Sequence, residues 1–291
     1  MCNKNIGCKW PKDKIFKSAP ILTHPARAGE GFNLPNKQKS SNFLQVLFMI
    51  HIDVFPYPPP VLPCAGKTVV MIDVLRASST IVTALANGCR AIIPVEDAEA
   101  AQAMKTRYPD ALLCGERDGL KIRGFDLGNS PFEYESAKIA GKELILTTTN
   151  GTHAARLADD AGAVLVASFL NFQAMIEHLK SVEGEIIILC AGNDRQFSLE
   201  DALCGGLLAG HLYNEVQNCR LTDAAEWARH AANSLLGKAH PLSVEVIYPL
   251  LHQSEHGRKL FELHFENDIR HCARLNVFAQ VPLLKQGKFI I

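Results

Sequence analysis

Short apolar runs recur along most of this chain, and they constrain its fold more than any other feature. Residues 68–72 (Thr-Val-Val-Met-Ile), 91–95 and 186–189 are largely apolar at consecutive positions and too short to be helices. Consecutive apolar residues are typical of strands that helices cover on both faces, as in parallel sheets. We expect further strands of the same sheet at residues 50–55, 111–114, 144–146 and 163–166.

Segments with helical character separate these runs. Residues 79–87 and 98–108 each follow a strand, and helices are expected to dominate after about residue 200, at residues 226–236 and 257–274. A last short strand is expected from residue 277 to residue 284. Strands that alternate with helices predict an α/β fold with right-handed crossovers. We therefore expect a three-layer α/β/α sandwich with a largely parallel sheet and a helix-rich C-terminal third.

The first 48 residues differ from the rest of the chain. They contain eight Lys or Arg, only two Asp or Glu, and four prolines, without sustained periodicity. Such a composition is typical of segments that cannot bury a core. We expect residues 1–48 to be a poorly ordered extension upstream of the natural start, and residues 49–291 to form one domain that begins at Met49.

The charge balance and the cysteine pattern exclude several classes of protein. Thirty Lys and Arg offset thirty Asp and Glu, so we expect no nucleic-acid or membrane partner. No apolar run approaches the ~20 residues that a bilayer-spanning helix needs. The nine cysteines form no Cys-x-x-Cys pair, which argues against a disulfide scaffold or a structural zinc site. We expect a cytoplasmic protein.

Polar clusters follow three of the expected strands. They occupy residues 73–80, 147–152 and 190–201, and each leads into a helix. In open α/β sheets, ligands bind outside the carboxyl ends of strands. We therefore expect the three clusters to form one site.

The first cluster combines groups that suit a metal-bound phosphoester. Asp73 follows the strand directly, Arg76 lies three residues later, and Ser79 and Thr80 begin the helix. A carboxylate, a guanidinium and helix-start amides bind metals and oxyanions. Capping alone would explain Asp73 and Ser79 but not Arg76. A nucleophilic aspartate of the haloacid-dehalogenase type is disfavoured, because that pattern wants a second Asp where this chain has Leu75.

The second cluster is rich in hydroxyl and amide groups. We expect Thr149, Asn150, Gly151 and Thr152 to bind substrate, because hydroxyls and helix-start N–H groups cradle oxyanions and glycine lets the backbone approach closely. The alternative is a threonine-rich strand edge with an ordinary Asn-Gly turn. No Gly-Lys-Ser/Thr follows, so the segment is not a Walker loop.

Two further segments supply acidic and basic candidates. Glu116 and Asp126 are suitable ligands for a hard cation, Arg117 is a candidate second anion clamp, and Asn129 is a candidate substrate-binding residue. Glu200 and Asp201 begin a helix. They either complete a Mg²⁺ shell or only interact with the helix dipole.

Cys190 and His256 leave alternatives open. A cysteine phosphatase wants five residues between its Cys and Arg, whereas Cys190 and Arg195 enclose four. A buried structural cysteine is therefore the favoured interpretation. The His-Gly-Arg segment at residues 256–258 either presents a basic side chain to the site or lies on a solvated helix.

Six motifs, in order along the chain, carry a family resemblance. They lie at residues 70–80 (Val-Met-Ile-Asp-Val-Leu-Arg-Ala-Ser-Ser-Thr), 115–117 (Gly-Glu-Arg), 124–131 (Gly-Phe-Asp-Leu-Gly-Asn-Ser-Pro), 147–152 (Thr-Thr-Thr-Asn-Gly-Thr), 197–201 (Phe-Ser-Leu-Glu-Asp) and 256–258 (His-Gly-Arg). In these motifs the chain resembles the 2-phosphosulfolactate phosphatase family from about Met49 onward. It departs from the family pattern at Asp118, where a second glycine is expected, and at Asn276, where an acid is usual.

The resemblance implies a Mg²⁺-dependent phosphatase that converts (R)-2-phospho-3-sulfolactate to sulfolactate and phosphate in coenzyme M biosynthesis. We expect water to attack phosphorus, with Arg76 or Arg117 stabilising charge, and Asp73 to be a metal ligand first and a covalent nucleophile second. The expected metal ligands are Asp73, Glu116, Asp126, Glu200 and Asp201. A phosphatase of the same fold acting on another small phosphoester, and a non-catalytic anion-binding protein, are the alternatives. A homodimer is a further expectation.

Overall fold

The computed structural model describes residues 50–237 and 241–291. The predictions of a poorly ordered extension at residues 1–48 and of a start at Met49 lie outside the described residues. Eleven strands form one sheet in the order β5-β4-β6-β3-β11-β10-β7-β2-β8-β1-β9. Their bounds are β1 Ile50–Phe55, β2 Thr68–Ile72, β3 Ala91–Pro94, β4 Leu112–Arg117, β5 Leu120–Lys121, β6 Glu143–Thr147, β7 Ala163–Ala167, β8 Glu185–Cys190, β9 Cys219–Leu221, β10 Leu283–Lys285 and β11 Lys288–Ile290.

Most neighbouring strands are parallel, and they form two blocks. One block is β4-β6-β3, and the other is β7-β2-β8-β1-β9. The antiparallel hairpin of β10 and β11 joins the blocks, with Phe289 opposite Ile92 of β3 and Leu283 opposite Leu165 of β7. The sheet is thus largely parallel, as predicted, and its antiparallel pairs are this hairpin, its two flanking contacts and the short β4–β5 pair.

Helices connect most of the parallel strands and dominate the C-terminal third. Ten helices are described: α1 Ala77–Ala86, α2 Ala98–Arg107, α3 Ser136–Ile139, α4 Gly151–Leu157, α5 Phe172–Leu179, α6 Leu199–Glu215, α7 Asp223–Leu236, α8 Val244–Gln253, α9 Glu255–Glu262 and α10 Glu266–Cys272. Local caps fix where several of them begin. The side chains of Ser198, Thr222 and Ser254 accept backbone N–H bonds at the starts of α6, α7 and α9.

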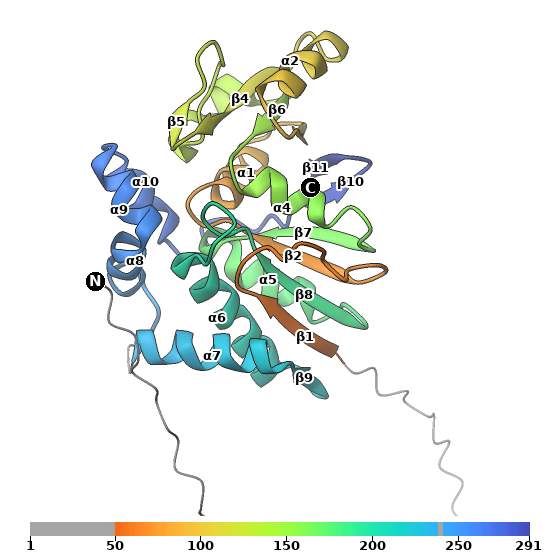
Figure 1. The fold of residues 1–291 in the computed structure, drawn as a ribbon, viewed down its shortest axis with the longest axis vertical. Coiled ribbons are helices and arrows are strands. Elements are labelled where there is room, and N and C mark those ends of the chain that lie inside the picture. Colours follow the sequence, from red (N-terminus) through yellow and green to blue (C-terminus); the bar gives the residue numbers. More distant parts are fainter. Residues whose placement is uncertain (1–49, 238–240) are drawn as a thin grey trace, which may run out of the picture. The chain divides into compact units, whose positions relative to one another are not determined.

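Each block has helices on both faces. One apolar core packs α5, α6 and α7 against residues such as Ile52 and Ile188 of the larger block. A second core combines α1 and α4 with Met71 of the larger block and Ile92 of the smaller one, so these two helices lie between the blocks (Figure 1). A third core packs α2 against the remaining face of the smaller block, at Ile145. The predicted layered α/β fold is confirmed.

Two C-terminal elements differ from the predictions. Residues 277–282 are not a strand, and the final strands are the hairpin pair β10 and β11. The helix predicted over residues 257–274 is divided into α9 and α10, because His264 adopts a left-handed φ of 65° and ends the first helix. The short edge strands β5 and β9 have too few residues to show a sequence pattern.

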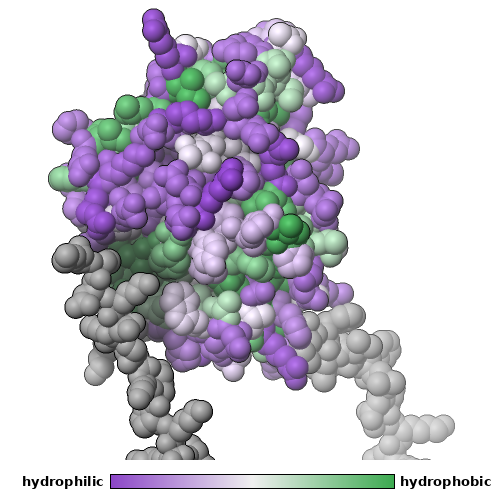
Figure 2. Space-filling view, in the orientation of Figure 1, coloured by the Kyte–Doolittle hydropathy of each residue, from purple (hydrophilic) through white to green (hydrophobic). Residues whose placement is uncertain are grey.

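The surface is mixed in character. Hydrophilic residues cover much of the face shown in Figure 2. No helix in residues 50–237 and 241–291 combines the length and the apolar character that crossing a bilayer needs.

Candidate active site

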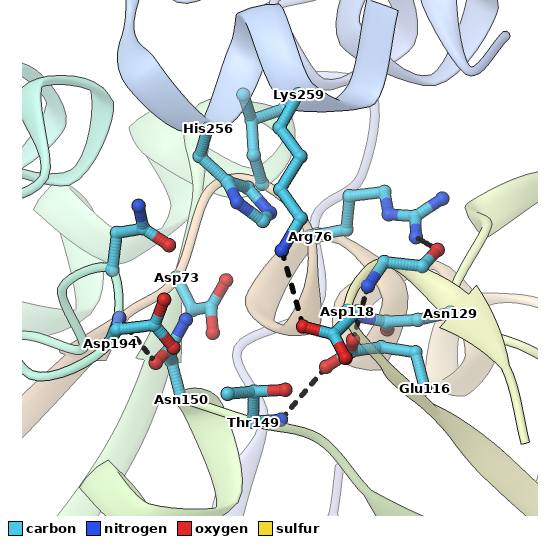
Figure 3. A pocket seen from close by; sticks show the side chains of 13 residues that line it. Asp73, Arg76, Glu116, Asp118, Asn129, Thr149, Asn150, Asp194, His256 and Lys259 are labelled. Atoms are coloured by element: carbon cyan, nitrogen blue, oxygen red, sulfur yellow. Dashed lines mark hydrogen bonds and ion pairs between the residues drawn. The ribbon is translucent and has the colours of Figure 1, made fainter. Parts of the chain in front are cut away.

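The site is a cleft where the first residues of α1 and α4 meet, between the two blocks of strands. The residues that line it come from six separate parts of the chain (Figure 3): Asp73, Leu75, Arg76, Glu116, Asp118, Gly119, Asn129, Thr149, Asn150, Asn193, Asp194, His256 and Lys259. The first two polar clusters of the sequence therefore come together, as predicted. From the third cluster the cleft receives Asn193 and Asp194 rather than Glu200 and Asp201.

Asp73 is the carboxylate most closely tied to the start of α1. It follows β2 directly, its side chain is 5% exposed, and its Oδ1 accepts a hydrogen bond from Ala77 N at 3.1 Å. Burial, together with the neighbouring carboxylates of Glu116 and Glu200, raises the pKa of Asp73 to about 7. Asp73 thus stabilises the first N–H of α1 through a hydrogen bond, and its negative charge is disfavoured by burial. A bound cation would stabilise that charge.

Gly151 leaves the space beside Asp73. A Cβ atom at this position would lie 2.9 Å from Asp73 Oδ2 and 2.5 Å from the Cβ of Ala77. Any other residue would therefore displace the carboxylate or push α4 away from α1. The predicted role of Gly151 is to let the backbone approach a ligand, whereas the atoms that it approaches in the structure belong to Asp73 and Ala77.

Glu116 fixes two loops at the cleft. Its Oε1 accepts a hydrogen bond from Thr149 N and its Oε2 accepts one from Gly119 N, both at 2.8 Å. The side chain is 7% exposed. Glu116 therefore holds the threonine loop after β6 against the turn after β4, and it lines the cleft while doing so.

Arg76 lines the cleft, but both of its terminal nitrogens already have partners. Its Nη1 forms an ion pair with Asp268 Oδ2 at 2.6 Å, and its Nη2 donates to Gly119 O at 2.6 Å. The guanidinium also lies over the ring of Phe265, 4.3 Å from the ring centre. Ser130 Oγ donates to the other oxygen of Asp268 at 2.8 Å. In this arrangement Arg76 connects α1 to α10 and to the β4–β5 turn.

α9 contributes two side chains to the cleft, His256 and Lys259. Burial, followed by the charge of Arg76, lowers the pKa of His256 to about 4. The Nδ1 atom of His256 is buried and has no hydrogen-bond partner among the described residues. The Lys259 ammonium lies 3.5 Å from Asp118 Oδ1 (Figure 3). Of the two alternatives for the His-Gly-Arg segment, His256 lines the cleft, whereas Arg258 is exposed and donates to Gln253 O.

The loop after β8 closes another side of the cleft. Asp194 N donates to Asn150 Oδ1 at 3.1 Å, which links this loop to the start of α4. Asp194 and Arg195 both adopt left-handed backbone conformations, with φ of 49° and 62°. The oxygen of the Asn150 amide is thereby occupied, so its nitrogen is the atom that can donate to a ligand.

Several predicted substrate-binding residues are used inside the fold. Ser79 Oγ donates to Val74 O, Thr80 Oγ1 donates to Asn129 O, and Thr152 Oγ1 donates to Thr148 O, each at 2.8 Å. These three side chains are buried and do not line the cleft. Their hydroxyls donate to backbone carbonyls near the starts of α1 and α4, so these bonds serve the fold, and Ser79 does not cap α1 as the alternative interpretation supposed.

Arg117 and Asp126 lie away from the cleft lining. Arg117 donates from Nη1 to Glu116 O at 2.6 Å and from Nη2 to Thr147 Oγ1 at 2.9 Å, so it stabilises the edge of the β4-β6-β3 block. Asp126 is exposed, and its Oδ2 accepts a hydrogen bond from Leu113 N at 2.8 Å.

Glu200 and Asp201 are buried beside Asp73, behind the cleft lining. Asp201 accepts hydrogen bonds from Val74 N at 2.8 Å and from Gly192 N at 3.1 Å, and so connects the ends of β2 and β8. Burial, followed by the charges of Asp73 and Glu200, raises the pKa of Asp201 well above its ordinary value. Burial also raises the pKa of Glu200. Asp201 is therefore an internal partner of loop backbone, and Glu200 contributes to the raised pKa of Asp73.

Cys190 is a buried thiol at the end of β8. It is fully buried, it does not line the cleft, and burial raises its pKa well above the ordinary value. All seven cysteines that the structure describes are free. The favoured interpretation, a structural cysteine, agrees with this environment.

Two carboxylates and one amide oxygen at the cleft are the candidate ligands for a hard cation. Among the described residues, no three His, Cys, Asp or Glu side chains are arranged to hold a metal ion. Asp73 and Glu116 do line the cleft together, and the buried Oδ1 of Asn129 has no hydrogen-bond partner within the described chain. Mg²⁺ is commonly held by one or two carboxylates, with water and substrate phosphate completing its shell.

Sequence reasoning missed Asp118, Asn193, Asp194, Lys259 and Asp268. Asp118 and Asp194 both adopt a left-handed backbone, which no short pattern in the sequence announces. The sequence could have predicted Lys259 as a site residue, because it is three residues after His256 and therefore on the same helix face. Asp268 had no signal, since it meets Arg76 from a helix 192 residues away.

Comparison with known proteins agrees with this geometry. The family described as 2-phosphosulpholactate phosphatase matches residues 61–287. A relative from Thermotoga maritima named "Probable 2-phosphosulfolactate phosphatase" is 42% identical over 232 residues, which cover 80% of this chain and 95% of that protein. Proteins of the same name from Clostridium acetobutylicum (36% identical; 77% and 92% covered) and Symbiobacterium thermophilum (37%; 80% and 97%) are also similar. The chain belongs to the 2-phosphosulfolactate phosphatase family.

Proposed function

We propose that this protein hydrolyses the phosphoric monoester of (R)-2-phospho-3-sulfolactate and releases sulfolactate and phosphate. The observation that carries the proposal is the cleft at the starts of α1 and α4, where a buried carboxylate, an unpartnered amide oxygen and a lysine converge. Helix-start N–H groups favour oxyanions. The names of the relatives support this choice of substrate.

We propose Mg²⁺ as the cofactor. The cleft is lined by four carboxylates, Asp73, Glu116, Asp118 and Asp194, and such a lining would repel an anionic substrate unless a cation lies between them. Asp73, with Glu116 and the Oδ1 of Asn129, would hold the ion. When bound, Mg²⁺ supplies charge neutralisation at the phosphoryl oxygens. The oxygen-only ligand set favours Mg²⁺ over Zn²⁺.

The side chains of this protein then orient the ester for attack by water. Asn150 presents its amide nitrogen to a phosphoryl oxygen. Arg76 keeps the β4–β5 turn and α10 in place through Gly119 and Asp268, and we assign it a positioning role while direct contact with the substrate stays a prediction. Arg117 is held at the edge of a strand block and acts on the site through the backbone of Glu116.

The test measures phosphate release from a panel of small phosphoesters, with Mg²⁺ and after removal of metal with EDTA. We expect the highest kcat/KM for 2-phosphosulfolactate and loss of turnover in EDTA that Mg²⁺ restores. Preference for another ester would indicate a phosphatase of this family with a different substrate. Binding of anions without any turnover would indicate a non-catalytic anion-binding protein. Full turnover after exhaustive chelation would contradict the metal requirement.

A role in coenzyme M biosynthesis, a cytoplasmic location and a homodimer stay predictions. They rest on the family resemblance and on composition, and the cleft geometry bears on none of them. Sedimentation of the purified protein tests the dimer directly.

A further inference from the structure

Lys259 is the cation at the cleft that is least committed to the protein. Two positively charged side chains line the described cleft, Arg76 and Lys259. Arg76 is buried and bonded through both terminal nitrogens. The Lys259 side chain is 40% exposed, and its ammonium has one ion pair, at 3.5 Å, with Asp118, whose side chain is 91% exposed. An exposed pair at this distance contributes little free energy, so a ligand can displace it at small cost.

His256 adds a polar atom to the same surface. It precedes Lys259 by three residues, which places both side chains on one face of α9. Both line the cleft, and Figure 3 shows them extending from α9 toward the cleft interior. The buried Nδ1 of His256 has no partner among the residues that the structure describes. An unsatisfied buried polar atom is costly, and a hydrogen bond to a ligand would remove that cost.

The proposed substrate carries more acid than the phosphoryl group alone. 2-Phosphosulfolactate also has a sulfonate and a carboxylate, and both are ionised at neutral pH. Near Asp73 and Glu116, an additional oxyanion would meet like charge. The α9 surface differs in that it provides a displaceable ammonium and an unpartnered ring nitrogen beside the carboxylates of Asp118 and Asp194.

Resting on the proposed function, we propose that Lys259 and His256 bind the substrate's second oxyanion, a sulfonate or a carboxylate, and thereby determine specificity. Asp118 is the counter-ion that occupies Lys259 when the cleft is free of substrate. α9 thus recognises the part of the molecule that does not react, while the junction of α1 and α4 acts on the phosphoryl group.

The experiment compares four phosphoesters with the full chain. They are 2-phosphosulfolactate, 2-phospholactate without the sulfonate, 2-phosphooxyethanesulfonate without the carboxylate, and phenyl phosphate without either. For Lys259→Ala we expect the kcat/KM for 2-phosphosulfolactate, relative to that for phenyl phosphate, to fall roughly 10- to 100-fold, mainly through KM, as for loss of a charged hydrogen bond. One of the two intermediate esters keeps only the carboxylate and the other keeps only the sulfonate. The one whose kcat/KM, relative to that for phenyl phosphate, falls by the same factor in Lys259→Ala identifies the group that Lys259 binds.

Matched variants separate binding from structural damage. Arg258→Ala removes the same charge from the neighbouring position of α9, whose side chain is exposed and does not line the cleft, and should leave the four ratios unchanged. Lys259→Gln keeps the length of the chain without its charge and should repeat the effect of Lys259→Ala. Thermal melting of each variant verifies that it is folded.

Asp118→Asn provides an independent test in the opposite direction. Asparagine tolerates the left-handed φ of 55° at this position but carries no charge, so Lys259 loses its competing partner. We expect the KM for 2-phosphosulfolactate to fall severalfold. That gain should disappear in the Asp118→Asn/Lys259→Ala double variant, because it requires the ammonium.

Two results would overturn the inference. If Lys259→Ala reduces turnover of all four esters by one factor, the lysine acts on the phosphoryl group, and if it changes none of them, α9 does not bind substrate. Either result leaves the proposed function intact, since the wild-type protein still hydrolyses the esters. Absence of wild-type turnover on every ester is a different outcome, and it would refute the proposed function itself.

Discussion

Asp73 serves two purposes that make opposite demands on its carboxylate. As a cap, it accepts a hydrogen bond from Ala77 N and stabilises the start of α1. As a buried acid near Glu116 and Glu200, it carries a charge that its surroundings disfavour. Capping alone does not require a charge, because asparagine caps helices about as well. Replacing Asp73 by asparagine therefore removes the charge while keeping an oxygen that can accept the hydrogen bond from Ala77 N.

For Asp73→Asn we expect catalysis to be abolished at ordinary Mg²⁺ while the chain stays folded. If Asp73 is a metal ligand, raising Mg²⁺ should recover part of the turnover, whereas a lost covalent nucleophile would not be rescued at any concentration. A Mg²⁺ titration of phosphate release measures this. Asp126→Asn is the matched control, because that acid lies away from the cleft and should keep the wild-type Mg²⁺ dependence. Wild-type turnover of Asp73→Asn would mean that Asp73 is only a cap.

For Cys190→Ser we expect substantial turnover. The thiol is fully buried with a raised pKa and does not line the cleft, so it has neither the ionisation nor the access of a nucleophile. The measurement is kcat per folded molecule, with the folded fraction taken from circular dichroism. A loss beyond roughly a thousandfold in a folded protein would instead indicate a covalent intermediate on sulfur.

For Asp268→Asn we expect a loss of about 3–5 kcal/mol in the free energy of unfolding, because the Arg76 charge would remain buried without its partner. Denaturant titration gives this value. Glu266→Gln, on the same helix but exposed, should cost less than about 1 kcal/mol. Equal losses of unfolding free energy in the two variants would show that the buried Arg76–Asp268 ion pair stabilises the fold no more than an exposed contact does.

At the scale of elements, sequence patterns located the strands and helices well where packing is uniform. The strands around Val70 and Ile188 are covered on both faces, so consecutive apolar residues marked them correctly. Pattern reasoning did less well in the C-terminal part, where a single left-handed residue, His264, divides one predicted helix into two. It also could not pair β10 with β7, since that contact depends on the arrangement of the whole chain.

For Phe289→Ala we expect a loss of about 3–5 kcal/mol in the free energy of unfolding. Phe289 is 1% exposed, belongs to the core that contains α1 and α4, and lies opposite Ile92 in the sheet. Its hairpin connects the two blocks of strands, so we also expect turnover to fall at temperatures where the wild type is stable. Ile291→Ala is the control, because that neighbouring side chain is exposed and should have little effect. Thermal and denaturant unfolding measure both variants.

At the scale of the molecule, we expect a chain that starts at Met49 to fold and to retain turnover. The family match covers residues 61–287, and the relatives align with about four fifths of this chain while nearly all of their own length is covered. Expression of residues 49–291, with phosphate release compared at equal protein concentration, tests this. Loss of folded protein in the shorter chain would contradict it.

The prediction of the site succeeded at the scale of loops and was less complete for individual side chains. The first two polar clusters meet because the helices that follow them pack between the same two blocks of strands. Within those clusters, hydroxyls such as that of Ser79 turn inward to backbone oxygens, and no spacing rule distinguishes an inward hydroxyl from one that faces a ligand. Residues contributed from elsewhere, above all Lys259 and Asp268, required the full topology.

The β10–β11 hairpin also sets the order of events during synthesis on the ribosome. Both strands come after all the others along the described chain, yet they lie in the middle of the sheet, between β3 and β7. The two blocks can begin to form while the polypeptide is still emerging, but they cannot be joined through the sheet until residues 283–290 have left the exit tunnel. His256 and Lys259 also arrive late. The sheet of a nascent chain is therefore completed only after this hairpin has emerged.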